Sequence, residues 1–154
     1  MRYVNHDIVF QEFPDEVTLA INISGCPNGC PGCHSPHLQQ DTGDELTGER
    51  LTALVENYRG EITCVGFMGG DADPARVFRL AALLKEHFGP TLHTGWYSGR
   101  TQVPAARDLV HLDYLKLGPY IAARGPLSAA TTNQRMFRVE GEKLVDITAR
   151  FQKA

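Results

Sequence analysis

The segment Val17-Thr-Leu-Ala-Ile-Asn-Ile-Ser24 alternates in side-chain character and is rich in β-branched residues, a pattern that predicts a β-strand. It leads directly into Gly25 and the run Cys26-Pro-Asn-Gly-Cys30-Pro-Gly-Cys33. Prolines and glycines recur through residues 27–37, so this region predicts a loop and no regular helix or strand. The strand and its loop begin an alternation of strands and helices that continues along the chain.

Further strands are expected at Ile62–Met68, Thr91–Tyr97 and Asp113–Leu117. Helices are expected at 48–58, where Thr47 would be the N-cap, at 74–88, where Asp73 would be the N-cap and Pro74 the first helical residue, and at 105–109. Val4–Phe13 reads as a short strand or hairpin, and Met136–Val139 with Lys143–Ile147 as a terminal hairpin.

Strands that alternate with helices indicate parallel βαβ units, so we predict an α/β fold with a mostly parallel sheet. The 154 residues suit one domain spanning 1–154. Ligands of such sheets bind beyond the carboxyl ends of the strands. The loops that follow the predicted strands are therefore expected to meet at one face.

Composition restricts the classes of partner. A net charge of −3 gives no basic surface for nucleic acid, and no apolar run is long enough to span a bilayer. Residues 1–7 lack the apolar stretch of a secretory signal. We therefore expect a cytoplasmic protein, in which clustered cysteines read as metal ligands and not as disulfides.

The three cysteines Cys26, Cys30 and Cys33 suit a 4Fe–4S cluster in which one iron has no protein ligand, because electron-transfer clusters ordinarily take four cysteines. An open coordination position is typical of a working metal site. The alternative is a zinc site whose fourth ligand is His34 or His37. The remaining cysteine, Cys64, lies in an apolar strand and is expected to be a small buried hydrophobe.

Three further motifs follow predicted strands. One interpretation of Gly69-Gly70-Asp71 is a tight turn after a strand. The other is a binding turn, in which the glycines let a ligand approach the backbone and Asp71 accepts hydrogen bonds from an amine of that ligand. In Trp96-Tyr97-Ser98-Gly99-Arg100, Ser98 can bond a ribose hydroxyl and Arg100 a carboxylate, or the segment only packs on the core. Lys116 either binds a ligand carboxylate or is a solvated edge residue.

The sequence resembles the anaerobic ribonucleoside-triphosphate reductase-activating proteins, a family of radical S-adenosylmethionine (SAM) enzymes that activate glycyl-radical enzymes. The resemblance covers nearly the whole chain. Its segments are Ile23–Cys26 with Cys30–His34, Phe67–Pro74, Gly95–Arg100, Lys116–Tyr120 and Thr131–Arg135. Gly32 stands where many radical SAM enzymes have an aromatic residue against adenine, but Pro-Gly is common at this place in the activases.

The resemblance implies a mechanism. Cys26, Cys30 and Cys33 would hold the 4Fe–4S cluster, SAM would chelate the fourth iron, and a flavodoxin-like donor would supply one electron. Cleavage of SAM would give a 5′-deoxyadenosyl radical that takes a hydrogen atom from a glycine of the reductase. The implied SAM-binding residues are Gly32, Cys33, His34, Gly69, Gly70, Asp71, Ser98 and Lys116.

The resemblance also implies a partial (β/α) barrel of the radical SAM type, open on one side, because a full barrel needs about 250 residues. The polar segment Arg124–Arg135 is expected near the mouth of the site, in contact with the reductase. Two alternatives of the same chemistry are a pyruvate formate-lyase-type activase and a 7-deazaguanine-forming enzyme. An alternative of another class is a non-catalytic iron–sulfur or zinc module.

Overall fold

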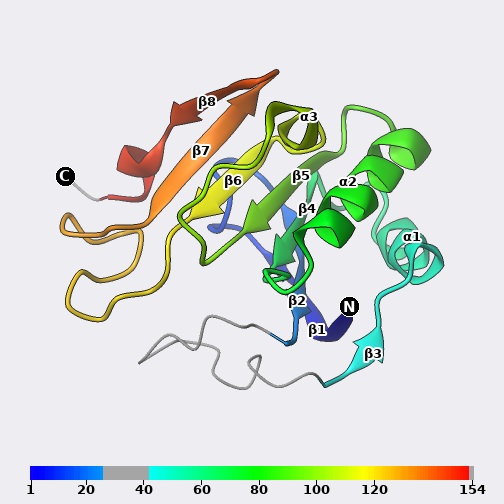
Figure 1. Ribbon diagram of the computed structural model, residues 1–154. Coiled ribbons are helices and arrows are strands. Elements are labelled where there is room, and N and C mark those ends of the chain that lie inside the picture. The colour runs from blue at the N-terminus through cyan, green and yellow to red at the C-terminus, as the bar shows by residue number, and fades with distance from the viewer. Residues whose placement is uncertain (26–41, 153–154) are drawn as a thin grey trace.

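The computed structural model of the protein describes residues 1–25 and 42–152 (Figure 1). Among these residues the strands form one sheet, in the order β3-β1-β2-β4-β5-β6-β7-β8. The strands are β1 (Arg2–Val9), β2 (Thr18–Ile23), β3 (Asp44–Glu45), β4 (Cys64–Met68), β5 (His93–Tyr97), β6 (Tyr114–Leu117), β7 (Arg135–Glu140) and β8 (Lys143–Asp146). The helices are α1 (Gly48–Asn57), α2 (Pro74–Phe88), α3 (Ala106–Leu109) and the 3-10 helix η2 (Thr148–Phe151).

The centre of the sheet is parallel. Strand β2 pairs with β4, β4 with β5, and β5 with β6, all in the parallel sense. Helices α1, α2 and α3 lie in the connections that lead into β4, β5 and β6, as crossovers between parallel strands require. The expected caps are present, because the side chains of Thr47 and Asp73 accept hydrogen bonds from the third residues of α1 and α2.

The predicted fold class is nevertheless wrong. Within the described residues, four of the seven neighbouring strand pairs are antiparallel (β1–β2, β1–β3, β6–β7 and β7–β8), and three are parallel. The strand order runs from β3 at one edge to β8 at the other, so the sheet is mixed and not a mostly parallel partial barrel. The cause is the antiparallel pairing at both edges of the sheet: β1 pairs with β2 and with β3, and residues 118–134 bring the chain back from β6 to β7 without a crossover helix.

One face of the sheet carries the helices (Figure 1). Inward side chains of β2, β4 and β6, such as Ile21, Phe67 and Leu115, pack there in one apolar core with Leu51 of α1 and Leu84 of α2, and none of these five is exposed. Burying a side chain of this size stabilises a fold by about 1.5–3 kcal/mol.

The opposite face has a smaller core around Phe13, Cys64, Tyr114 and Met136. Phe13 is fully buried, and its ring covers the backbone of Gly66 in β4 and Gly95 in β5: a Cβ on either glycine would lie 2.7 or 2.4 Å from the ring. This contact holds the segment before β2 against the middle of β4 and β5. The cavity described below lies on the same face, toward the carboxyl ends of these strands.

A search of the described helices for membrane spans finds none that is long and apolar enough to cross a bilayer.

Candidate functional site

The polar turns predicted from the sequence meet at the carboxyl edge of the parallel strands. Gly69, directly after β4, donates its N–H to Tyr97 O at the end of β5 (3.1 Å). Ser98, directly after β5, donates its N–H to Lys116 O in β6 (2.9 Å). The structure therefore brings Gly69, Ser98 and Lys116 together, as expected from the rule that parallel strands present their carboxyl ends at one edge.

Five of the predicted site residues, Cys26, Cys30, Gly32, Cys33 and His34, lie outside the described residues. The structure does describe the two ends of that segment, which begins after Gly25 and returns at Thr42. Ser24 Oγ donates to Thr42 O (2.5 Å) and accepts from Thr42 N (3.2 Å). The segment that carries the cysteines thus starts and finishes at the carboxyl end of β2.

Asp71 is one of the most buried polar residues described, with an exposed fraction of 1%. Its Oδ1 accepts from Ser98 Oγ (2.6 Å), and its Oδ2 accepts from Gly99 N (2.8 Å). Arg100 Nη2 donates to the backbone oxygen of Asp71 (2.6 Å). Asp71, Ser98 and Arg100 are therefore brought together and bonded to one another, and their roles toward a ligand stay predictions.

The glycine pair before Asp71 is required by its conformation. Gly69 and Gly70 have φ of +111° and +100°, which side-chain-bearing residues rarely adopt. A Cβ on Gly70 would also lie 2.6 Å from a methyl carbon of Val77 in α2. The turn after β4 can therefore be built only with glycines, and it presents backbone without side chains at this edge.

Trp96 holds this turn, which sequence reasoning missed. Its indole Nε1 donates to Gly69 O (2.7 Å), while its ring lies edge-on to Phe78 of α2. The sequence indicated only an aromatic residue at a strand end. Because Trp96 and Gly69 lie on neighbouring strands, their contact depends on the strand register, which the sequence pattern does not specify.

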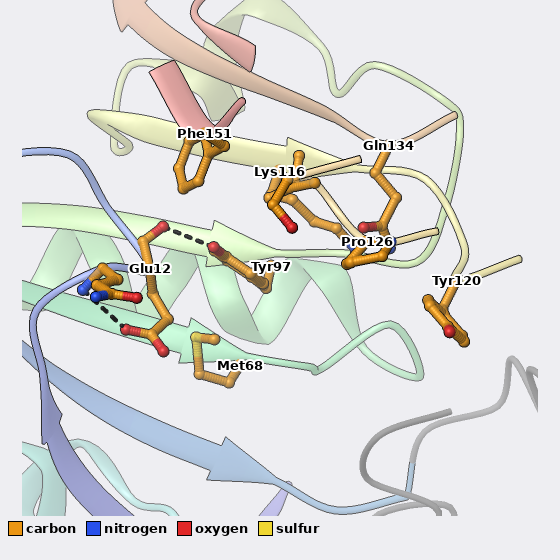
Figure 2. A pocket seen from close by; sticks show the side chains of 11 residues that line it. Glu12, Met68, Tyr97, Lys116, Tyr120, Pro126, Gln134 and Phe151 are labelled. Carbon is orange, nitrogen blue, oxygen red and sulfur yellow. Dashed lines mark hydrogen bonds between the residues drawn. The ribbon is translucent and has the colours of Figure 1, made fainter. Parts of the chain in front are cut away.

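A cavity of about 520 Å³ opens on the face of the sheet opposite α1, α2 and α3, where η2 contributes Phe151 to its lining, and Figure 2 shows the side chains around it. Met68, Tyr97 and Lys116 form its floor from three neighbouring strands, because Met68 is paired with Tyr97 and Tyr97 with Lys116. The remaining lining residues are Gln11, Glu12, Tyr120, Pro126, Leu127, Ser128, Gln134 and Phe151. Volumes of this size are typical of small-molecule sites.

Lys116 is the buried cation of this cavity, with an exposed fraction of 8%. Its Nζ donates to Gly118 O (2.9 Å) and to Ser98 O (3.3 Å), and it lies 5.6 Å from the centre of the Tyr97 ring. Carbonyl oxygens and an aromatic face both stabilise an ammonium group. The structure therefore holds the Lys116 amino group in place at this cavity, where the sequence predicted a site residue.

Tyr97 was not predicted as a site residue. Burial, followed by the nearby carboxylate of Glu12, raises the pKa of Tyr97, so its hydroxyl keeps its proton and donates to Glu12 O (2.6 Å). The segment Arg124–Arg135 was expected near the site mouth, and it lies mostly in the longer connection between β6 and β7. From this connection come five residues that line the cavity, Tyr120, Pro126, Leu127, Ser128 and Gln134.

Cys64 belongs to a different part of the molecule. It is fully buried at the first position of β4, at the opposite end of that strand from Gly69. Burial raises the pKa of the Cys64 thiol, so it remains protonated. This cysteine behaves as the small buried hydrophobe expected from its sequence context.

Within residues 1–25 and 42–152, no group of three or more His, Cys, Asp or Glu side chains is placed to hold a metal ion. Comparisons with protein-family models, with curated proteins and with solved structures each find no match to this chain.

Proposed function

We propose that the protein is a radical SAM enzyme that activates the anaerobic (class III) ribonucleoside-triphosphate reductase by generating a glycyl radical on it. Cys26, Cys30 and Cys33 would hold a 4Fe–4S cluster, and SAM would lie against the carboxyl edge of β4, β5 and β6. The alternative of another class is a non-catalytic iron–sulfur or zinc module, which would form neither 5′-deoxyadenosine nor a protein radical.

One observation supports this function above the others. Three motifs that lie far apart in the sequence, Gly69–Asp71, Ser98 and Lys116, adjoin one another at a single edge. The segment that carries the three cysteines leaves the same sheet at the carboxyl end of β2, which is the parallel neighbour of β4.

The donor set suits the proposed groups. Thiolates are the protein ligands of iron–sulfur clusters, and three of them leave one iron open. When bound, the cluster and SAM supply the one-electron chemistry that ends in removal of a hydrogen atom from a glycine. The chain supplies position and exclusion of water: Lys116 provides a fixed positive charge for a carboxylate, and the apolar side chains of Met68 and Leu127 help to line the cavity.

The partners follow from this chemistry. The reaction needs an outside electron, for which we propose a flavodoxin-like donor, and a reducing compartment such as the cytoplasm, where exposed thiolates persist. We propose that the reductase contacts the cavity mouth along the segment between β6 and β7. Arg124 and Arg135 of this region are exposed, so replacing both with glutamate should weaken binding of the reductase.

The test is transfer of a radical to a protein. The reconstituted, reduced protein is mixed with SAM and an anaerobic ribonucleoside-triphosphate reductase, and the glycyl radical is measured by electron paramagnetic resonance. We expect a radical with the wild-type protein and with Cys64→Ala, and none with Cys30→Ala. A radical that appears only on pyruvate formate-lyase would assign the other activase, and 5′-deoxyadenosine without any protein radical would assign a small-molecule radical SAM enzyme.

A further inference from the structure

The carboxylate of Asp71 joins two turns. Two of its hydrogen-bond donors, Ser98 Oγ and Gly99 N, belong to the turn after β5, whereas Asp71 itself belongs to the turn after β4 (2.6 and 2.8 Å). Burying a charged carboxylate is costly unless it is hydrogen-bonded, and short bonds to a charged acceptor are among the strong ones. The free energy of these bonds therefore holds the two turns together.

Arg100 adds two more hydrogen bonds to these turns. Its Nη2 donates to Asp71 O (2.6 Å), and its backbone N–H donates to Ser98 Oγ (3.1 Å). Ser98 Oγ therefore donates to Asp71 and accepts from Arg100 at the same time. Asp71, Ser98, Gly99 and Arg100 form a closed network, which we call the Asp71 network.

The Asp71 network lies directly beside the glycine pair. Both carbonyls of this pair are already bound, because Gly69 O accepts from Trp96 Nε1 (2.7 Å) and Gly70 O accepts from Asp73 N (3.0 Å). Glycines at positive φ are conformationally free unless their neighbours are fixed. Asp71, the next residue, fixes the carboxyl-terminal side of the pair to β5.

We infer that Asp71 is a positioning residue, which holds the Gly69–Gly70 backbone in the conformation that receives the ligand and acts through Ser98 and Gly99. The inference rests on the proposed function, because the ligand concerned is SAM. It differs from the expectation that the negative charge of Asp71 meets the amine of the ligand. The two roles make opposite predictions for an asparagine at this position.

Asparagine keeps the shape of the network without its charge. Its Oδ1 can accept from Gly99 N, and its Nδ2 can donate to Ser98 Oγ once the serine hydroxyl rotates. If Asp71 positions the turn, Asp71→Asn preserves SAM binding and Asp71→Ala does not. If Asp71 is the charge partner of an amine, Asp71→Asn loses SAM binding as Asp71→Ala does.

The chain contains one tryptophan, Trp96, whose indole N–H bonds to Gly69 O. Its indole resonance and fluorescence therefore report on the glycine turn in the full chain, without cluster or SAM. We expect Asp71→Ala to shift the Trp96 resonance and to speed hydrogen exchange at Gly99 by roughly ten- to a hundred-fold, the size expected for losing a bond to a charged acceptor. Asp71→Asn and the exposed control Asp7→Ala should leave both signals close to wild type.

In the reconstituted protein, the KM for SAM in 5′-deoxyadenosine formation should rise about tenfold or more in Asp71→Ala and stay within about threefold in Asp71→Asn. If Asp71→Ala fails to fold, Ser98→Ala is the second variant: it removes the bonds of Ser98 Oγ to Asp71 and to Arg100 N but leaves the bond from Gly99 N to Asp71, so it should show the same pattern more weakly. An unchanged Trp96 signal in Asp71→Ala would overturn the inference, as would a KM in Asp71→Asn as high as in Asp71→Ala. A wild-type protein that never cleaves SAM would refute the proposed function, and the Trp96 signal would still test the network.

Discussion

At the scale of single residues, Glu16 is the strongest polar anchor outside the candidate site. It is 7% exposed, and its carboxylate accepts three hydrogen bonds of 2.7 Å, from Thr63 Oγ1, His93 Nδ1 and Tyr114 Oη. The three donors stand at the amino-terminal ends of β4, β5 and β6. Glu16 therefore joins these strands at the end opposite to the Asp71 network.

Replacing Glu16 should destabilise the fold strongly. Glu16→Ala leaves the buried Tyr114 hydroxyl without its acceptor and removes the bonds to the more exposed Thr63 and His93, so we expect a loss of about 1–3 kcal/mol in the free energy of unfolding. The measurement is urea denaturation at pH 7, and Glu142→Ala, at an exposed position, is the control. A Glu16→Ala protein within about 0.5 kcal/mol of wild type would show that this anchor contributes nothing.

Part of the site was predictable at this scale. Gly69, Gly70, Asp71, Ser98 and Lys116 follow or end strands, and the strand-end rule predicted their meeting from sequence alone. Glu16 and Trp96 were not predictable, because their partners lie far away in the sequence and are set by strand register. The same limit applies to the Asp71 network: a sequence shows a carboxylate beside glycines but not which donors reach it.

At the scale of elements, the position of the Phe13 ring determines how side chains pack on the face of the sheet opposite α1, α2 and α3. Gly66 of β4 and Gly95 of β5 are directly paired, and both lie beneath the Phe13 ring. Two glycines side by side leave a hollow in the pleated surface that an aromatic ring from another segment can fill. This contact ties the segment before β2 to the middle of the sheet.

Adding a side chain at Gly95, beneath the Phe13 ring, should therefore destabilise the fold. The Cβ of Gly95→Ala would lie 2.4 Å from the Phe13 ring, so we expect a loss of about 1–3 kcal/mol from overpacking. Phe13→Leu in the same protein should recover part of that loss, which makes the two changes non-additive by at least about 0.5 kcal/mol in a double-mutant cycle. Strictly additive values from urea denaturation would contradict this packing.

Elements were predicted far better than their pairing. The predicted helices and main strands are present in the structure, as is the terminal hairpin, now β7 and β8. The fold class failed because periodicity gives the type of an element and not its neighbour. The two-residue strand β3 was missed because it is too short to show alternation, and residues 118–134 return the chain antiparallel without a crossover helix.

At the scale of the whole molecule, buried acidic groups make stability depend on pH in the alkaline range. Burial is the main cause that raises the pKa of Cys64, Tyr97 and Tyr114, and for Tyr114 the hydrogen bond to Glu16 adds to it. In the unfolded chain these groups lose protons near their ordinary values, about 8.5 for cysteine and about 10 for tyrosine. The folded protein therefore binds more protons than the unfolded chain at high pH.

The sign of the effect follows from this proton difference. The contribution is fully present below the unfolded pKa values and is lost as pH rises from about 8.5 toward the folded values, by at most about 1.4 kcal/mol per pH unit for each group. We expect the urea midpoint to fall steadily between pH 8 and pH 11. Tyr97→Phe should be less stable at pH 7, because it loses the bond to Glu12, but should fall less steeply; equal slopes would contradict the assignment.

The residues that hold the sheet together and the residues of the candidate site lie in different parts of the molecule. The helices and the Glu16 anchor hold one face and one end of the sheet, whereas the Asp71 network, Lys116 and the cavity lie toward the carboxyl ends of the parallel strands. The end of β2 delivers the cysteine-bearing segment to that same edge. We propose that reductive cleavage of SAM takes place at this edge.

The most direct measurement is 5′-deoxyadenosine formed by the anaerobically reconstituted protein after reduction with dithionite and addition of SAM, with iron and sulfide counted for each variant. We expect product from the wild type and from Cys64→Ala, whose thiol is buried away from the edge, and none from Cys26→Ala, Cys30→Ala or Cys33→Ala. A wild-type protein with a full cluster and no 5′-deoxyadenosine would contradict the claim, as would a Cys30→Ala protein as active as the wild type.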